Sequence, residues 1–140
     1  MIQQTRLLQH FRMGLLTNTS SDGAGQVDFQ VTKTNGLGAT QWSYTYGTTG
    51  DDVGTNMKST ADGGLIICGY SDSLIGFANK DIFITKLSSA GVHQWTKYIQ
   101  GDSNDIATDV IQSKAGDIYV SGYMKLDTMD INMVVARLSS

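Results

Sequence analysis

The sequence has no proline, one cysteine and two histidines among its 140 residues. The absence of proline argues against a disordered or linker-rich chain. Because Cys68 stands alone, the chain cannot form an intrachain disulfide, and cysteine usage gives no sign of an oxidising compartment. A zinc site usually needs three or four ligands, and the two histidines, His10 and His93, are far apart in the sequence. We therefore expect no metal ion and no cofactor.

Charge is also scarce, since only 16% of the residues are charged and the net charge is −3. The sequence has no run of lysine and arginine that could neutralise phosphates, which argues against a nucleic-acid partner. No apolar run reaches the length of a membrane span, so we expect no membrane partner. Residues 1–16 lack the unbroken apolar stretch and the small-residue cleavage site of a signal peptide. The sequence as it stands predicts a cytoplasmic protein.

The feature that the sequence does have is an internal repeat. Residues 28–71 align without a gap on residues 81–124, at a shift of 53 positions. The identical pairs are Asp28/Asp81, Thr32/Thr85, Lys33/Lys86, Gly38/Gly91, Gln41/Gln94, Trp42/Trp95, Asp52/Asp105, Thr55/Thr108, Gly63/Gly116, Gly69/Gly122 and Tyr70/Tyr123. A period near 50 residues with β-type composition is typical of stacked or radial repeat architectures.

Each repeat divides into four short β-type segments. The first segment is 53–60 or 106–113, the second 65–70 or 118–123, the third 28–33 or 81–87, and the fourth 39–46 or 92–99. Glycines in the turns between them supply the positive φ that tight hairpins need. Residues 132–140 resemble another third segment, 14–18 a worn second segment, and 2–5 a remnant of a first segment.

The pattern predicts a single repeat domain over residues 1–140, with units at about 1–47, 51–100 and 104–140. The last unit lacks its fourth segment. Residues 6–13 carry no turn signal, and we expect a short helix or an irregular lid there. In the second segments, neighbouring residues that point to opposite faces of a strand are both apolar. This predicts sheets that are covered on both faces.

These motifs resemble those of a family of bacterial β-propeller repeats. Such repeats read Lys-Leu-x-x-x-Gly-x-x-x-Trp, then Gly-Gly and Asp-Asp, then Asp-Gly-Gly-Tyr-Ile-x-x-Gly-Tyr. The first copy matches at Lys33, Gly38, Trp42, Gly47, Asp51, Asp52, Asp62, Gly63, Gly64, Gly69 and Tyr70, and the second at Lys86, Leu87, Gly91, Trp95, Gly101, Asp105, Gly116, Gly122 and Tyr123. The resemblance implies an all-β fold of four-stranded antiparallel blades around an axis, with the first segment innermost. It implies structural roles for these residues and says little about activity.

Nearly three blades in one chain do not make a ring, because propellers close with about 4–8 blades. A short array leaves apolar end faces in water. We therefore expect the chain to associate with itself, and we favour a homodimer that closes a six-bladed ring around a two-fold axis. The alternatives are another oligomer, an open half-propeller, or a fragment of a longer protein.

The candidate ligand-binding residues are four carboxylates, Asp51, Asp52, Asp105 and Asp109. They precede or lie within the first segments, so innermost first strands would bring them toward one mouth of a central channel. Grouped carboxylates can hold Ca²⁺, bind a cationic or hydroxyl-rich ligand, or act as an acid/base pair. The alternative is structural, because aspartate also accepts backbone N–H bonds in the turn before a strand.

Other residues point to packing rather than chemistry. Trp42 and Trp95 occupy the same position in two repeats, which favours packing between blades over ligand stacking. Cys68 lies inside a second segment with no histidine nearby in sequence, so we expect a buried, inert thiol. His93 lies on a fourth segment, where we expect a solvated or packing role.

The sequence thus favours a non-catalytic binding or interaction scaffold, half of a propeller, whose loops or channel mouth bind a protein or a carbohydrate. One alternative is a hydrolase or lyase acting on glycans through the aspartate cluster. A further alternative is a truncated gene remnant with no activity of its own. Fold alone licenses none of these choices.

Overall fold

The fold is taken from a computed structural model of the chain, which describes residues 5–9, 12–20, 27–72, 79–101, 103–125 and 131–139. Within these ranges the chain forms eleven β-strands and no helix, which confirms the prediction of an all-β protein. In the same ranges, no helical segment has the length and apolar character to cross a membrane.

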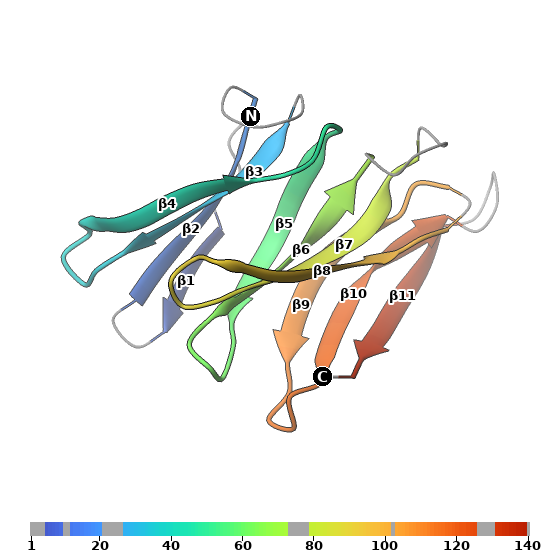
Figure 1. The fold of residues 1–140 in the computed structure, drawn as a ribbon. Helices are drawn as coiled ribbons and strands as arrows, with labels where there is room; N and C mark the ends of the chain where they lie inside the picture. Colours follow the sequence, from blue (N-terminus) through green and yellow to red (C-terminus); the bar gives the residue numbers. More distant parts are fainter. Residues whose placement is uncertain are drawn as a thin grey trace.

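The strands form three antiparallel sheets that follow one another along the chain (Figure 1). The first sheet contains β1 (Thr5–Gln9), β2 (Arg12–Thr19), β3 (Asp28–Thr34) and β4 (Thr40–Tyr46). The second contains β5 (Asp52–Ser59), β6 (Leu65–Ser71), β7 (Asp81–Leu87) and β8 (His93–Ile99). The third contains β9 (Ile106–Gln112), β10 (Ile118–Lys125) and β11 (Ile131–Leu138). The eight segments expected in the two aligned copies are confirmed as strands, and so are those expected at 14–18 and, where it is described, at 132–140. Among the described residues, the third sheet has three strands.

The expectation for residues 6–13 is wrong where the structure describes them. Residues 6–9 belong to β1 and residues 12–13 to β2, and the two strands pair from Thr5↔Leu16 to Gln9↔Arg12. Of the predicted first-segment remnant at 2–5, residues 2–4 lie outside the described part of the chain, and Thr5 begins β1. Pairing with a neighbouring strand decides the conformation here, which a local search for turn residues does not detect.

Glycines close four of the hairpins as the sequence predicts. Gly38, Gly63, Gly91 and Gly116 have φ values of 84°, 77°, 80° and 96°. In each turn the amide of this glycine donates to the carbonyl three residues earlier, as from Gly38 to Asn35 at 3.0 Å and from Gly91 to Ser88 at 3.0 Å. The left-handed conformation suits glycine because it has no Cβ.

The sheets stack face to face in chain order. β5 lies against β1, β2 and β3 of the first sheet, and β9 lies against β5, β6 and β7 of the second sheet. The first strand of a sheet is therefore its main contact with the preceding sheet.

Two hydrophobic clusters fill the two junctions. The cluster between the first and second sheets contains Leu16, Phe29, Val31, Met57, Ile67, Phe83 and Leu87. The cluster between the second and third sheets contains Ile66, Cys68, Ile82, Ile84, Ala107, Val110, Ile118 and Val120. Ile66 and Ile67 are neighbours on β6, belong to different clusters, and are both 0% exposed. This confirms that β6 is covered on both faces.

A buried ammonium ties the β5–β6 turn to β7. The side chain of Lys86 is 7% exposed, and its Nζ lies 2.9 Å from Oδ2 of Asp62. Nζ also donates to the carbonyl of Leu87 and to Oε1 of Gln94, both at 3.1 Å. The hydrogen bond from the Thr60 hydroxyl, followed by that from Lys86, holds the pKa of Asp62 well below its ordinary value.

This depressed pKa predicts an acid-sensitive contribution to stability. Because the folded-state pKa is lowered, the contribution is present above the unfolded pKa of about 3.9 and is lost as pH falls through the folded pKa. We expect Asp62→Asn to unfold more easily at pH 7 and to lose less stability than the native chain below about pH 4. Urea unfolding at a series of pH values measures both effects. If the free energy of unfolding fell equally for the two proteins as the pH was lowered, the Asp62 carboxylate would not be the source of this stability.

Candidate functional site

The structure places Asp51 in a backbone contact between two sheets. Its Oδ1 accepts a hydrogen bond from the amide of Val27 at 2.9 Å. At the aligned position one repeat later, Oδ1 of Asn104 accepts from the amide of Lys80 at 3.0 Å. The same bond in two repeats indicates a role in linking each sheet to the next.

Asp52 and Asp105 strengthen the same links and are 3% and 0% exposed. Their amides donate to the carbonyls of Val27 and Lys80, at 2.7 and 2.6 Å. Oδ2 of Asp52 accepts from the amide and hydroxyl of Thr48, at 2.6 and 2.7 Å. Oδ1 of Asp105 accepts from the amide of Lys125 at 3.1 Å. These contacts fit the structural alternative, in which aspartate accepts N–H bonds beside the start of a strand.

Asp109 lies within β9, apart from the turn that precedes the strand. Its Oδ1 accepts from Nδ2 of Asn56 at 2.9 Å and lies 3.6 Å from Nζ of Lys58. Asp109 therefore connects β9 to β5, whereas the other three candidates lie just before those strands or, for Asp52, at the first residue of β5. Among the described residues, no three His, Cys, Asp or Glu side chains are placed to hold a metal ion.

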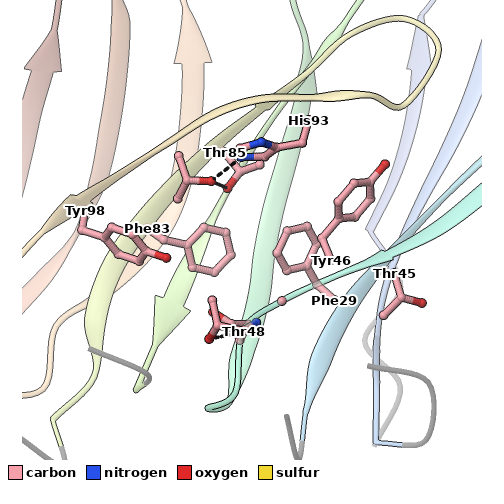
Figure 2. A pocket seen from close by; sticks show the side chains of 11 residues that line it. Phe29, Thr45, Tyr46, Thr48, Phe83, Thr85, His93 and Tyr98 are labelled. Atoms are coloured by element: carbon pink, nitrogen blue, oxygen red, sulfur yellow. Dashed lines mark hydrogen bonds between the residues drawn. The ribbon is translucent and has the colours of Figure 1, made fainter. Parts of the chain in front are cut away.

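A cleft of about 380 Å³ lies between the first and second sheets, beside β4 and β8 (Figure 2). Phe29 and Phe83, 3% and 2% exposed, stack with ring centroids 5.2 Å apart. Tyr46 extends this stack from the first sheet at 5.5 Å from Phe29, and Tyr98 lines the cleft from the second sheet. The cleft therefore combines two phenylalanine and two tyrosine rings with threonine side chains and the carboxylate of Asp52.

Polar groups line the cleft and are mostly engaged with each other. The hydroxyls of Thr85 and Thr96 lie 2.8 Å apart, and Nε2 of His93 lies 2.9 Å from the Thr96 hydroxyl. The Tyr46 hydroxyl donates to the carbonyl of Gly91 at 2.5 Å. This bond ties β4 to the turn before β8.

The two phenols of the cleft, Tyr46 and Tyr98, stay neutral near pH 7. Burial, with a smaller effect of Tyr44, raises the pKa of Tyr46 to about 12. Burial, followed by the charge of Asp52, raises the pKa of Tyr98. Protonated phenols form hydrogen bonds and apolar contacts but do not act as bases.

The sequence repeat does not reveal this cleft, because the repeat emphasises positions that recur. Phe29 and Tyr46 align with Ile82 and Ile99 at the shift of 53, so the aromatic rings belong to the first junction alone. The difference between aligned positions is the signal that could have found it.

The other candidates have packing roles. Cys68 is fully buried, and burial raises the pKa of its thiol to about 11, as expected for an inert thiol. Trp42 packs against the cluster between the first and second sheets, and Trp95 against the cluster between the second and third. The prediction that both tryptophans pack between sheets is confirmed. His93 is exposed.

The third sheet exposes an apolar face that we call the terminal face. Val134, Ala136 and Leu138 pack against the second sheet, so the alternate residues of β11 point the other way. The apolar residues of the terminal face are Met133 (87% exposed), Val135 (67%), Ile111 (50%), Tyr123 (36%) and Tyr119. The polar residues on the same face include Ser121 and Arg137. A shallow hollow of about 300 Å³ lies among Ile111, Tyr119 and Val135.

The corresponding face of the second sheet is covered by a neighbouring sheet. Its residues Ile66, Ile82 and Ile84 are 0% exposed because the third sheet covers them. By the repeat alignment, Tyr119, Met133 and Val135 hold the same positions on the terminal face. No further sheet of the described chain lies over them.

The first sheet ends the stack with a different chemistry. Where side chains are described, the face away from the second sheet carries Thr17, Gln30, Thr32 and Ser43 together with the half-buried Leu15, and we call it the polar face. Thr32 and Ser43 share a hydrogen bond of 2.6 Å. Thr17 and Gln30 align with Ile67 and Phe83, which are buried in the second sheet. Among the described side chains, this end of the stack is therefore mostly polar, whereas the terminal face is mostly apolar.

Comparison with known proteins finds no protein-family model and no curated protein that matches the chain. The resemblance to β-propeller repeats remains a prediction from the motifs quoted above. The geometry of the described residues therefore carries the functional argument.

Proposed function

We propose that the chain is a non-catalytic interaction scaffold that a second copy completes by covering its terminal face. The observation that supports this is the exposed apolar face of the third sheet, whose equivalent in the second sheet is buried. Contiguous apolar patches in water favour association, since burial contributes roughly 25 cal/mol per Å². The neutral phenols of the cleft and the hydrogen bonds that engage Asp51 and Asp105 support a role in binding rather than catalysis.

The chemistry of the two end faces favours one arrangement of the dimer. A six-bladed ring would press the terminal face of one copy onto the polar face of the other. That junction would bury the amide of Gln30 and the hydroxyl of Thr17 against apolar side chains, which costs free energy unless each finds a partner. A two-fold arrangement that joins the terminal faces to each other matches apolar with apolar. It leaves both polar faces in water, as a capping repeat requires.

Two matched variants test this arrangement. We expect Val135→Lys to raise the dimer dissociation constant by about two orders of magnitude or more, since burying an unpaired ammonium in an apolar interface costs several kcal/mol. Gln30→Lys places the same charge on the polar face and is expected to leave dimerisation unchanged. Sedimentation equilibrium at micromolar concentration measures both, with circular dichroism to check folding.

Each outcome separates the arrangements. Loss of association in both variants would favour the closed ring over the two-fold contact between terminal faces. A native chain that stays monomeric would contradict the proposal as a whole. The ligand expected from the sequence, a protein or a carbohydrate, remains a prediction.

A further inference from the structure

The third sheet is incomplete at its edge as well as on its face. Its strand order is β11-β10-β9, and no described strand pairs with the side of β11 that faces away from β10. The equivalent strands, β3 and β7, pair on that side with β4 and β8. One side of β11 therefore offers backbone N–H and C=O groups that two other strands of this chain use for pairing.

β11 does not have the features that protect a natural edge strand. Lysine, proline or a bulge usually protects an edge strand from pairing with another chain. The edge strands β4 and β8 fit that rule, since each has a register shift against its neighbour and several exposed polar residues. β11 pairs with β10 over eight consecutive residues without a shift and reads Ile-Asn-Met-Val-Val-Ala-Arg-Leu. By composition and geometry β11 is an inner strand.

The second sheet supplies part of the surface on which another strand would lie. Trp95 and Ile99 of β8 pack against the cluster shared with the third sheet and are only partly buried. In the first junction, β4 faces β8 across the cleft, with Tyr46 bonded to Gly91. The third sheet has no counterpart of β8 to complete this arrangement among the described strands.

We propose that the free edge of β11 binds an extended peptide segment as a fourth, antiparallel strand. Such strand addition derives affinity from main-chain hydrogen bonds and specificity from alternate side chains. The occupant has the pattern shared by the strands that fill this place in the other sheets. β4 reads Thr-Gln-Trp-Ser-Tyr-Thr-Tyr and β8 reads His-Gln-Trp-Thr-Lys-Tyr-Ile. The backbone edge of β11 is distinct from the terminal face, and the proposal goes beyond the dimer described above. The tryptophan and isoleucine of the bound peptide would lie on the same side of the sheet as Met133 and Val135.

The repeat also predicts the register of the added strand. β7 and β8 pair as Ile82↔Ile99, Ile84↔Lys97 and Lys86↔Trp95. Because residues 132–140 align with residues 81–89, the corresponding positions on β11 are Met133, Val135 and Arg137. The tryptophan of the peptide would thus lie beside Arg137, whose side chain is 63% exposed and able to stack on an indole ring.

The probe is a synthetic peptide with the sequence of residues 92–100, Val-His-Gln-Trp-Thr-Lys-Tyr-Ile-Gln, added to the intact chain. We expect saturable binding by calorimetry, and slower hydrogen exchange in residues 132–138. Two further peptides carry N-methyl groups on alternate amides, one on each edge of the strand. The peptide methylated on the edge that faces β11 is expected to lose affinity by about tenfold or more, and the other to retain it.

The controls separate the edge from the face. A scrambled peptide is expected to bind at least about tenfold more weakly, because its tryptophan and isoleucine no longer meet their positions. Ile111→Lys alters the terminal face on β9, far from the β11 edge, and is expected to leave peptide binding unchanged. The proposal would be overturned if the peptide showed no saturable binding, or if both methylated peptides lost the same affinity. Slower exchange at residues outside β11 would overturn it as well.

Discussion

The Phe83→Ala variant is expected to lose about 3–5 kcal/mol of unfolding free energy. Phe83 is 2% exposed and belongs to the cluster that joins the first and second sheets. Its ring stacks on Phe29 at 5.2 Å, and Phe29 in turn stacks on Tyr46. Removing the ring therefore leaves a cavity at the base of the cleft and weakens a stack that extends to β4.

Urea unfolding monitored by circular dichroism measures this loss. The matched control is Leu37→Ala, since Leu37 is 95% exposed and its truncation is expected to change stability by less than about 0.5 kcal/mol. If both variants unfold at the same urea concentration, the junction between the first two sheets is not a packed core. Because Phe83 also lines the cleft, the variant further tests whether the cleft needs this base to keep its shape.

The order of the strands can be predicted because the turns between them recur at the same positions in each repeat. Gly38 and Gly91 recur at the same place and have positive φ, so the turns can be recognised from the sequence alone. The same reasoning fails at residues 6–13, where β1 and β2 pair without a glycine signal. Strand pairing there depends on a partner rather than on local sequence, and a search for turn residues does not detect it.

The candidate site could be predicted only in part. The position of Asp51 and Asp105 beside the first strands was predictable, and so was the alternative that they accept backbone N–H bonds. The cleft was not predictable, since its rings at Phe29 and Tyr46 occupy positions where the next repeat has isoleucine. A repeat alignment emphasises what the units share, whereas a site is built from what distinguishes one unit.

The difference between the two ends of the stack required the structure as well. Alternation along a strand shows that two faces exist, but not which face lies against a neighbouring sheet. Once Phe29 is known to face the second sheet, Gln30 must lie on the polar face, and once Val134 is packed, Val135 must lie on the terminal face. The charge and the apolar content of the whole chain are averages over both end faces, so they do not reveal that the two faces differ.

Replacing Gly69 by alanine is expected to lower the unfolding free energy by about 3 kcal/mol or more. A Cβ on Gly69 would lie 1.9 Å from the carbonyl oxygen of Val53 and 2.9 Å from Cε1 of Phe83. The carbonyl approaches because the register of β5 against β6 shifts between Gly54 and Asn56. Backbone cannot yield as the end of a flexible side chain can, so the clash must push β5 away from β6.

The repeat provides an internal copy of this arrangement in the third sheet. A Cβ on Gly122 would lie 2.2 Å from the carbonyl oxygen of Ile106, and the register of β9 against β10 shifts at the same place. In both sheets a threonine hydroxyl donates across the shift, from Thr55 to the carbonyl of Cys68 at 3.1 Å and from Thr108 to that of Ser121 at 3.2 Å. The glycine of the Gly-Tyr dipeptide therefore repeats because a bulge in the first strand requires it.

The control for Gly69→Ala separates this steric cost from that of backbone conformation. Gly38 has a φ of 84°, but no atom lies within 4 Å of the position that an added Cβ would take, so Gly38→Ala is expected to cost about 1–2 kcal/mol through backbone strain alone. Urea unfolding of Gly69→Ala, Gly122→Ala and Gly38→Ala ranks the three. The first two are expected to lose clearly more than the third. Equal losses in all three would mean that the bulges can relax and that the close approach of the Val53 and Ile106 carbonyls does not require glycine.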